Sequence, residues 1–128
     1  MIVDTSALLA IVLEAPEAER VAAAIFAAPV ARISTASFVE AAVVIERRRR
    51  DRLARFDQIV GDLGFTYEPV TYEQALAARG GFRRFGQTRH PARLNFGDCF
   101  AYALAATSRE PLLFKGDDFS RTDICPAL

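Results

Sequence analysis

Hydrophobic positions follow two different patterns along the chain. Short, nearly continuous apolar runs of strand length alternate with longer segments in which apolar residues recur every three or four positions, the spacing of one helix face. Polar segments at 87–95 and 116–123 predict loops, and Gly80 and Gly81 predict a kink or break in the helix that contains them. The expected strands are 2–4, 31–35, 65–70 and 111–115, and the expected helices are 5–14, 16–29, 36–50, 51–64, 71–86 and 96–109.

The alternation of strands and helices predicts an α/β fold. A connection between parallel strands needs a crossover, which is usually helical, so we expect a mostly parallel sheet covered by helices on both faces. The unbroken apolar run at 111–115 is typical of a central strand. With 128 residues and 52% apolar content, and without repeats or a linker, the sequence favours a single domain over residues 1–128.

Composition narrows the setting in which the protein works. The formal net charge is zero, which gives no overall attraction to nucleic acid. Apolar stretches end before the roughly 20 residues of a membrane span, and the start lacks the basic segment of a signal peptide, so we expect a cytoplasmic protein with no membrane contact. Cys99 and Cys125 lie in apolar surroundings without metal-type spacing, which predicts buried free thiols.

A dense basic run, ERRRRDRLAR, occupies residues 46–55. Its simplest interpretation is a solvated helix end, where cations also oppose the negative end of the helix dipole. The alternative is a patch that contacts phosphates or an acidic segment of a partner, because the arginine fork suits phosphate and carboxylate groups.

Acidic residues occupy unusual positions in four separate segments. Asp4 follows the first expected strand and Asp117 and Asp118 follow the last, which places them at the edge where parallel sheets bind ligands. Glu40 and Asp98 lie on apolar helix faces without a cation one turn away, a setting in which charges are seldom buried unless paired or bound to metal. Helix capping explains Asp4, a first-turn position explains Asp98, and a side chain reaching solvent explains Glu40. None of these explanations predicts such acids from four segments.

Gathering carboxylates carries an electrostatic cost. Two unit charges about 4 Å apart repel by roughly 4 kcal/mol at an effective dielectric of about 20. A divalent cation would offset this repulsion, and oxygen ligands without nearby histidine or cysteine favour Mg²⁺, with Mn²⁺ as a substitute, over zinc. Mg²⁺ commonly binds one or two protein carboxylates together with substrate phosphate, as in metal-dependent nucleases.

Four stretches, in this order and spacing, carry a family resemblance: MIVDTSALLAI, STASFVEAAVVIE, LNFGDCFAYALA and PLLFKGDDFSRTDI. On them the chain resembles PIN-domain ribonuclease toxins of the VapC type over nearly its whole length. The resemblance implies a three-layer α/β/α sandwich around a short, mostly parallel sheet. It also implies Mg²⁺-dependent endonucleolytic hydrolysis of RNA, a homodimer, and neutralisation by a VapB-type antitoxin encoded beside the toxin. The apolar early helices and Arg47–Arg50 are candidate antitoxin surfaces.

The resemblance assigns roles to particular acids. The family's acids fall on Asp4, Glu40 and Asp98, and the pattern Gly-x-Asp-Phe places a fourth on Asp118. Asp117 occupies the variable position of that pattern and is kept as a residue that replaces or assists Asp118. By implication Asp4 and Asp98, with Asp118, hold Mg²⁺, while Glu40 orients the attacking water or an additional metal.

Polar residues near these acids are candidates for supporting roles. Thr5 and Ser6 follow the first acid as they do in the family, and their hydroxyls either orient a carboxylate, a water or a phosphate, or simply cap the first helix. Arg89 and Arg93 are candidates for gripping the RNA backbone. His90 is interpreted as a surface residue rather than the general base of a metal-free ribonuclease.

A response-regulator receiver domain is the alternative function. It has a similar size, a parallel sheet, an acidic metal pocket and a lysine near the end of a late strand, as Lys115 is. A receiver, however, has paired acids after its first strand and a phosphoacceptor aspartate after its third. Here Asp4 stands alone, and Asp57 and Asp62 lie in an expected helix. A PIN-like binding module without catalysis is a third possibility, which the presence of the acids disfavours.

Overall fold

Four short parallel strands form the centre of the molecule. The computed structural model covers residues 1–128, and its sheet has the order β3-β2-β1-β4, with every neighbouring pair parallel. Ile2 pairs with Arg32 on one side and with Leu112 on the other. The expected parallel sheet is therefore confirmed. The strands are β1 (Ile2–Val3), β2 (Arg32–Ser34), β3 (Thr66–Glu68) and β4 (Leu112–Leu113).

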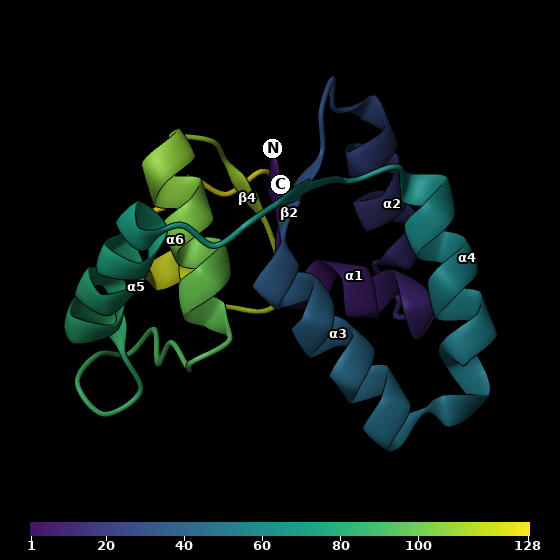
Figure 1. Cartoon of the computed structure of the whole chain (residues 1–128), viewed down its shortest axis with the longest axis horizontal. Helices are drawn as coiled ribbons and strands as arrows, with labels where there is room; N and C mark the ends of the chain where they lie inside the picture. Colours follow the sequence, from purple (N-terminus) through teal and green to yellow (C-terminus); the bar gives the residue numbers. More distant parts are fainter.

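Helices cover both faces of this sheet. Figure 1 shows α5 and α6 on one side of the strands and α1 to α4 on the other, which gives three layers and confirms the α/β/α sandwich. None of the helices combines the length and the apolar character that crossing a bilayer requires. The helices are α1 (Thr5–Val12), α2 (Ala18–Ala27), α3 (Thr35–Arg48), α4 (Leu53–Leu63), α5 (Tyr72–Phe85) and α6 (Asp98–Ser108), with short 3₁₀ turns η1 (Arg50–Arg52) and η2 (Phe119–Arg121).

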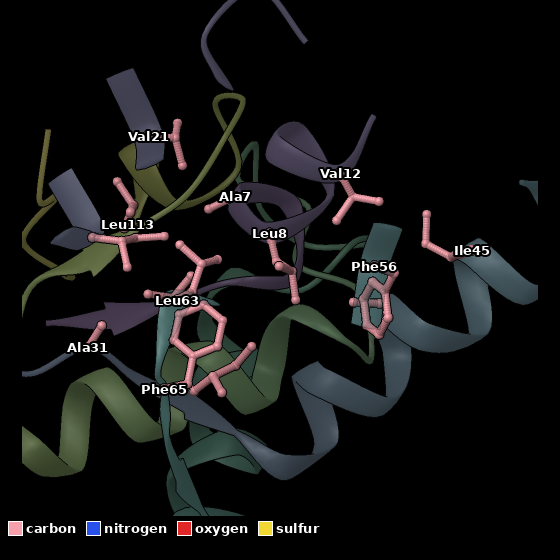
Figure 2. Packing of buried hydrophobic residues seen from close by; sticks show 14 residues of the cluster. Ala7, Leu8, Val12, Val21, Ala31, Ile45, Phe56, Leu63, Phe65 and Leu113 are labelled. Carbon is pink, nitrogen blue, oxygen red and sulfur yellow. The ribbon is translucent and has the colours of Figure 1, made fainter. Parts of the chain in front are cut away.

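The two faces of the sheet carry separate apolar clusters. Successive residues of a strand point to opposite faces, so even a strand of two residues contributes to both. Val3 and Leu113 belong to the cluster under α1, α2 and α4, part of which Figure 2 shows. Ile2 and Leu112 belong to the cluster with α5 and α6. All four side chains are almost completely buried, which fixes the strand ends from which the acids project.

The predicted central position of the strand at 111–115 is wrong. β4 lies at the edge of the sheet, next to β1 only. Its outer side is covered by the end of the chain, where Leu112 N–H donates to the Cys125 carbonyl and Ala127 N–H donates to the Leu112 carbonyl, both at 2.9 Å. The apolar run reflects helices on one face, helices on the other and this terminal segment along the edge. An apolar pattern reports burial and does not distinguish these sources.

The predicted break at Gly80 and Gly81 is also wrong, because α5 is continuous through both residues. Gly81 instead allows close approach of two helices. A Cβ at this position would overlap the ring of Tyr102 on α6, whereas a Cβ on Gly80 would meet nothing within 4 Å. The pair therefore contains one glycine required for packing and one without such a constraint.

Two further expectations concern the cysteines and the basic run. Both cysteines are free as expected, but Cys125 is exposed rather than buried, because it lies in the terminal segment outside the edge strand.

The basic run is a solvated helix end whose arginines pair with nearby acids. These ion pairs are Arg49–Asp51, Arg50–Glu46, Arg52–Glu14 and Arg55–Glu14.

Gly81→Ala is expected to lower the free energy of unfolding by about 1–3 kcal/mol, the usual cost of overpacking a core. The added methyl overlaps Tyr102, whose hydroxyl also donates to Asp123 at 2.9 Å and so resists movement. Gly80→Ala is the matched control, expected to raise stability by about 0.5–1 kcal/mol through helix propensity. Urea denaturation measures both, and equal effects would contradict this account of α5.

Candidate active site

Asp4 is the most deeply buried acid of the molecule, with only 2% of its surface exposed. It follows β1 and caps α1 with an extended backbone. Its Oδ2 accepts hydrogen bonds from the Ser6 amide at 2.9 Å and the Ser6 hydroxyl at 2.6 Å. Its Oδ1 is buried without any hydrogen-bond partner. Capping therefore explains one oxygen, while the other is left in a state that costs free energy unless a ligand satisfies it.

The hydroxyls that follow Asp4 hold the surrounding segments together. The Ser6 hydroxyl accepts from the Lys115 amide at 2.9 Å, which ties the start of α1 to the end of β4. Thr5 Oγ1 donates to Glu40 Oε2 at 2.7 Å and also lies 3.1 Å from the Ser37 carbonyl. Both hydroxyls thus orient carboxylates, one of the roles that the sequence left open, whereas contact of Thr5 or Ser6 with substrate stays a prediction.

Glu40 reaches the site from α3. This helix begins directly after β2 and is capped by Ser34, whose hydroxyl accepts from the Ala36 amide at 3.3 Å. The Glu40 carboxylate packs against Gly97, so closely that a Cβ on Gly97 would overlap it. Glu40 therefore points toward the start of α6, where it is partly buried and lines the groove next to α3.

Asp98 is the first residue of α6 and not the third, as the sequence suggested. The preceding residues form a turn closed by two reciprocal hydrogen bonds. The Asn95 amide donates to Asp98 Oδ2 at 2.8 Å, and the Asp98 amide donates to Asn95 Oδ1 at 2.9 Å. This is the logic of a capping box. Asn95 was not among the expected site residues, although its spacing of three from Asp98 was a usable signal.

The electrostatics of the site show that the acids converge. Burial raises the pKa of Asp4 to about 6, against the lowering effect of the Ser6 hydrogen bonds, and the charge of Glu40 raises it further. Burial also raises the pKa of Asp98 to about 7, with further increases from the charges of Asp4, Asp118 and Glu40. Such mutual effects require proximity. The structure thus brings together acids from the ends of β1 and β4, from α3 and from α6.

None of these acids is neutralised by a basic side chain. The ion pairs of the molecule involve other carboxylates, such as those of Glu14, Glu17 and Asp123. The engaged oxygens of Asp4 and Asp98 accept only from neutral groups. The cluster therefore retains its negative charge and the capacity to bind a cation.

The two adjacent acids after β4 differ in their relation to the site. Asp118 precedes η2, and its charge adds to the raised pKa of Asp98 after burial and the charge of Asp4, whereas Asp117 is not among the causes of that rise. Both are exposed, and the Asp117 carbonyl accepts from the Ser120 hydroxyl at 2.6 Å within its own turn. This electrostatic effect is consistent with Asp118 as the fourth acid, and the assignment stays a prediction.

The single histidine of the loop at 87–95 makes local contacts. His90 Nδ1 accepts from the Ala92 amide at 3.1 Å, and its ring packs edge-on against Phe85 with centroids 5.1 Å apart. The histidine therefore shapes the loop. Arg89 and Arg93 are exposed and form no ion pair, and their contact with substrate stays a prediction.

The donor set fits a hard divalent cation that keeps part of its hydration shell. No three acidic, histidine or cysteine side chains are arranged to enclose a metal ion by themselves. The unpartnered Oδ1 of Asp4 and the neighbouring Asp98 nevertheless offer carboxylate oxygens in one place. Mg²⁺ needs only one or two protein carboxylates when waters and phosphate oxygens complete its coordination. Gly97 leaves the space that the Glu40 carboxylate occupies, and this role could not be predicted from the sequence.

Comparison with known proteins places this geometry in a family. The PIN domain family matches residues 1–124. The chain is 45% identical over 130 residues to ribonuclease VapC28 of Mycobacterium tuberculosis, an alignment that covers 100% of this chain and 98% of that protein. It is 46% identical over 125 residues to ribonuclease VapC of Mycolicibacterium smegmatis, with 97% of each chain covered.

Two solved structures share the fold. One is VapC20 of Mycobacterium tuberculosis, described as a toxin that cleaves the sarcin-ricin loop, with a TM-score of 0.75, 18% identity and coverage of 96% of this chain and 95% of that one. The other is a toxin–antitoxin complex from Klebsiella pneumoniae, with a TM-score of 0.71, 18% identity and coverage of 95% and 92%. At this identity they support the fold alone.

These findings overturn the receiver-domain alternative. The family that matches is the PIN domain family, and the relatives reported above are VapC ribonucleases, not receiver domains. The sheet also differs, because in the flavodoxin-like order of receivers β1 lies between β2 and β3, whereas here it lies between β2 and β4. The resemblance of Lys115 to a receiver lysine is likewise superficial, since its ammonium pairs with Glu17 at 2.8 Å.

The metal-free protein is expected to lose stability as pH rises from about 4 to 7. The folded-state pKa of Asp4 is raised to about 6, so the folded state binds more protons than the unfolded state across this interval. Asp4→Asn should therefore be more stable than the wild type at pH 8, by at most about 3 kcal/mol, at ~1.4 kcal/mol per pKa difference of one. The gap should close toward pH 4.

Urea denaturation in chelator at several pH values measures this gap. Asp57→Asn, an exposed substitution on α4, serves as the control for the loss of one carboxylate elsewhere. A gap that widens as pH falls would have the wrong sign for a buried acid with a raised pKa and would contradict the placement of Asp4.

Proposed function

The chain belongs to the PIN domain family, in its VapC type, and we propose that it is a Mg²⁺-dependent endoribonuclease acting as the toxin of a toxin–antitoxin pair. The observation that carries the proposal is the buried, unpartnered oxygen of Asp4 within a cluster of acids that no cation neutralises. The names of the relatives support ribonuclease activity, and the unpaired acids supply chemistry that suits it.

We assign a role to each acid. Asp4 and Asp98, assisted by Asp118, hold Mg²⁺ or its substitute Mn²⁺, and Ser6 keeps Asp4 oriented so that Oδ1 is available. When bound, the metal lowers the pKa of water and offsets negative charge on the phosphate. Glu40, held by Thr5, orients the attacking water. Hydrolysis then joins the water oxygen to phosphorus and breaks the bond to the leaving sugar oxygen, without a side-chain nucleophile.

The proposal includes partners and a place of action. RNA is the substrate, and a VapB-type antitoxin encoded beside the toxin is the regulator, in the cytoplasm where both RNA and antitoxin are made. The solved toxin–antitoxin complex with this fold supports a scaffold compatible with such a partner. Arg89 and Arg93, exposed on their loop, remain candidates for contacts with the RNA backbone.

A homodimer is also part of the proposal, and an apolar surface supports it. We call this surface the dimer face; it consists of Val39 and Val43 on α3, Phe82 on α5, and Phe96 and Phe100 beside and on α6.

The dimer face has a shape that suits contact with a second copy. Phe96, 79% exposed, lines both a groove of about 540 Å³ next to α3 and a groove of about 380 Å³ next to α5. A projecting ring beside two grooves suits a two-fold contact, in which each copy inserts the same feature into the other. Arg79 is the single cation lining these grooves, which disfavours an RNA backbone as their occupant.

Asp4→Asn and Asp98→Asn are expected to lower Mg²⁺-dependent kcat on RNA at least about 100-fold, because each removes a charged ligand from a site built on few ligands. Asp118→Asn should cost about 10-fold, the lower end of the usual effect of outer partners on a metal site. The matched control Asp117→Asn should change activity less than twofold. Cleavage is followed on labelled RNA with chelator, Mg²⁺ or Mn²⁺.

The same variants can be tested in cells. Expression of the wild type should arrest growth, and co-expression of the adjacent open reading frame should relieve the arrest, whereas Asp4→Asn should not arrest growth at all. Undiminished RNA cleavage by the wild type in chelator would rule out the metal-dependent mechanism. Absence of cleavage with either metal would rule out the enzyme.

Val39→Arg combined with Val43→Arg is expected to convert a dimer to a monomer, because two buried cations without partners destabilise an apolar interface. Phe26→Arg is the matched control, since Phe26 is 65% exposed but lies on α2, outside the dimer face. Light scattering during size-exclusion chromatography measures the mass. A wild type that is monomeric, or a double variant that stays dimeric, would place the contact elsewhere or remove it.

A further inference from the structure

We propose that Gly97 is a positioning residue for Glu40, and that Gly97 and Thr5 together clamp the Glu40 carboxylate in one orientation. The consequence for catalysis rests on the function proposed above. The clamp itself is a feature of the geometry: the carboxylate lies between the start of α1, which supplies Thr5, and the start of α6, which supplies Gly97.

The backbone does not require glycine at position 97. Its φ of −62° and ψ of −45° lie in the right-handed helical region, which every L-residue adopts readily. By this criterion alanine would suit the position at least as well as glycine, because the cap is supplied by Asn95 and glycine carries an entropic cost where the backbone is already helical. The constraint is therefore space beside the backbone.

That space is filled by Glu40. The three nearest atoms to a Cβ on Gly97 are all in the Glu40 carboxylate group, namely Oε1, Cδ and Oε2. No side chain larger than hydrogen fits at position 97 while Glu40 keeps its place. The first turn of α6 thus closes directly on the carboxylate.

The opposite side of the carboxylate is held by a fixed donor. Glu40 Oε2 accepts from Thr5 Oγ1 at 2.7 Å, and Thr5 is itself only 7% exposed. Thr5 Oγ1 also lies 3.1 Å from the Ser37 carbonyl, so the hydroxyl is anchored to the helix that carries Glu40. The carboxylate is therefore limited on one side by a hydrogen bond and on the other by the Cα of Gly97.

The clamp sets the relative positions of three acids. Thr5 follows Asp4 in the chain, and Gly97 precedes Asp98. Because the Glu40 carboxylate contacts Thr5 and Gly97 directly, its position relative to Asp4 and Asp98 is fixed. Displacement of a reacting group by about 1 Å can cost about 100-fold in rate. The Glu40 carboxylate, however, ends a flexible side chain and can move away without disturbing the fold. Loss of the clamp should therefore reduce activity while leaving stability intact.

Gly97→Ala tests this separation. We expect kcat on RNA to fall about 10-fold to 100-fold, with KM changed less than twofold, because the substrate still binds while Glu40 is misplaced. The denaturation midpoint should be unchanged or higher. Gly61→Ala in α4, where a Cβ meets nothing within 4 Å, is the matched control and should leave both kcat and KM unchanged. A Gly97→Ala enzyme with full kcat would overturn the proposal.

Two further measurements distinguish positioning from general damage. Thr5→Val should lower kcat in the same way and Thr5→Ser should restore it, because serine retains the hydroxyl. A crystal structure of Gly97→Ala should show Glu40 beyond hydrogen-bond distance of Thr5 Oγ1. Glu40 found still bonded to Thr5, with α6 displaced instead, would overturn the clamp. If the wild type cleaves no RNA, the proposed function fails, and this crystal structure still decides the clamp.

Discussion

The burial of Asp4 and its closeness to other acids are the constraint on which the site depends. Asp4 lies at the end of a strand that is buried on both faces, so its position is set by the core and cannot relax toward solvent. Its backbone amide donates to the Leu113 carbonyl at 2.9 Å, which fixes it further against β4. Burial is the main cause of the raised pKa values of Asp4 and Asp98, and the charges of the neighbouring acids add to it, so that protonation or a cation relieves the cost.

The topology explains why acids so distant in sequence meet. β1 and β4 are parallel neighbours, and the loops that leave them carry Asp4 and Asp118 to the same edge of the sheet. Glu40 comes from the second turn of α3, which begins where β2 ends at this edge, and α6 brings Asp98 from the layer on the other face. The site therefore lies where both helical layers reach the same edge of the sheet, as expected for parallel α/β folds.

The sequence predicted the acids more reliably than their surroundings, for a physical reason. A carboxylate in an apolar pattern is anomalous wherever the chain folds, so Asp4, Glu40 and Asp98 became candidates through their combination and the family resemblance, although each has an ordinary local explanation by itself. The edge position of β4 and the role of Gly81 in α5 depend on which segments pack against them, the terminal residues in one case and Tyr102 in the other. Gly97 was invisible for the same reason, since its role is defined by a side chain 57 positions away in sequence.

The hydrogen-bond donors that hold the acids of the site are all uncharged. Asp4, Glu40 and Asp98 each have one oxygen held by a neutral group, the Ser6 hydroxyl and amide, the Thr5 hydroxyl and the Asn95 amide respectively. An arginine in any of these places would fix the geometry equally well but would cancel the charge permanently and compete with a dication. Neutral donors fix direction without cancelling charge. The arrangement therefore orients the acids in advance while leaving their mutual repulsion in place. A cation that bound here would remove this repulsion, and the free energy released would add to its affinity.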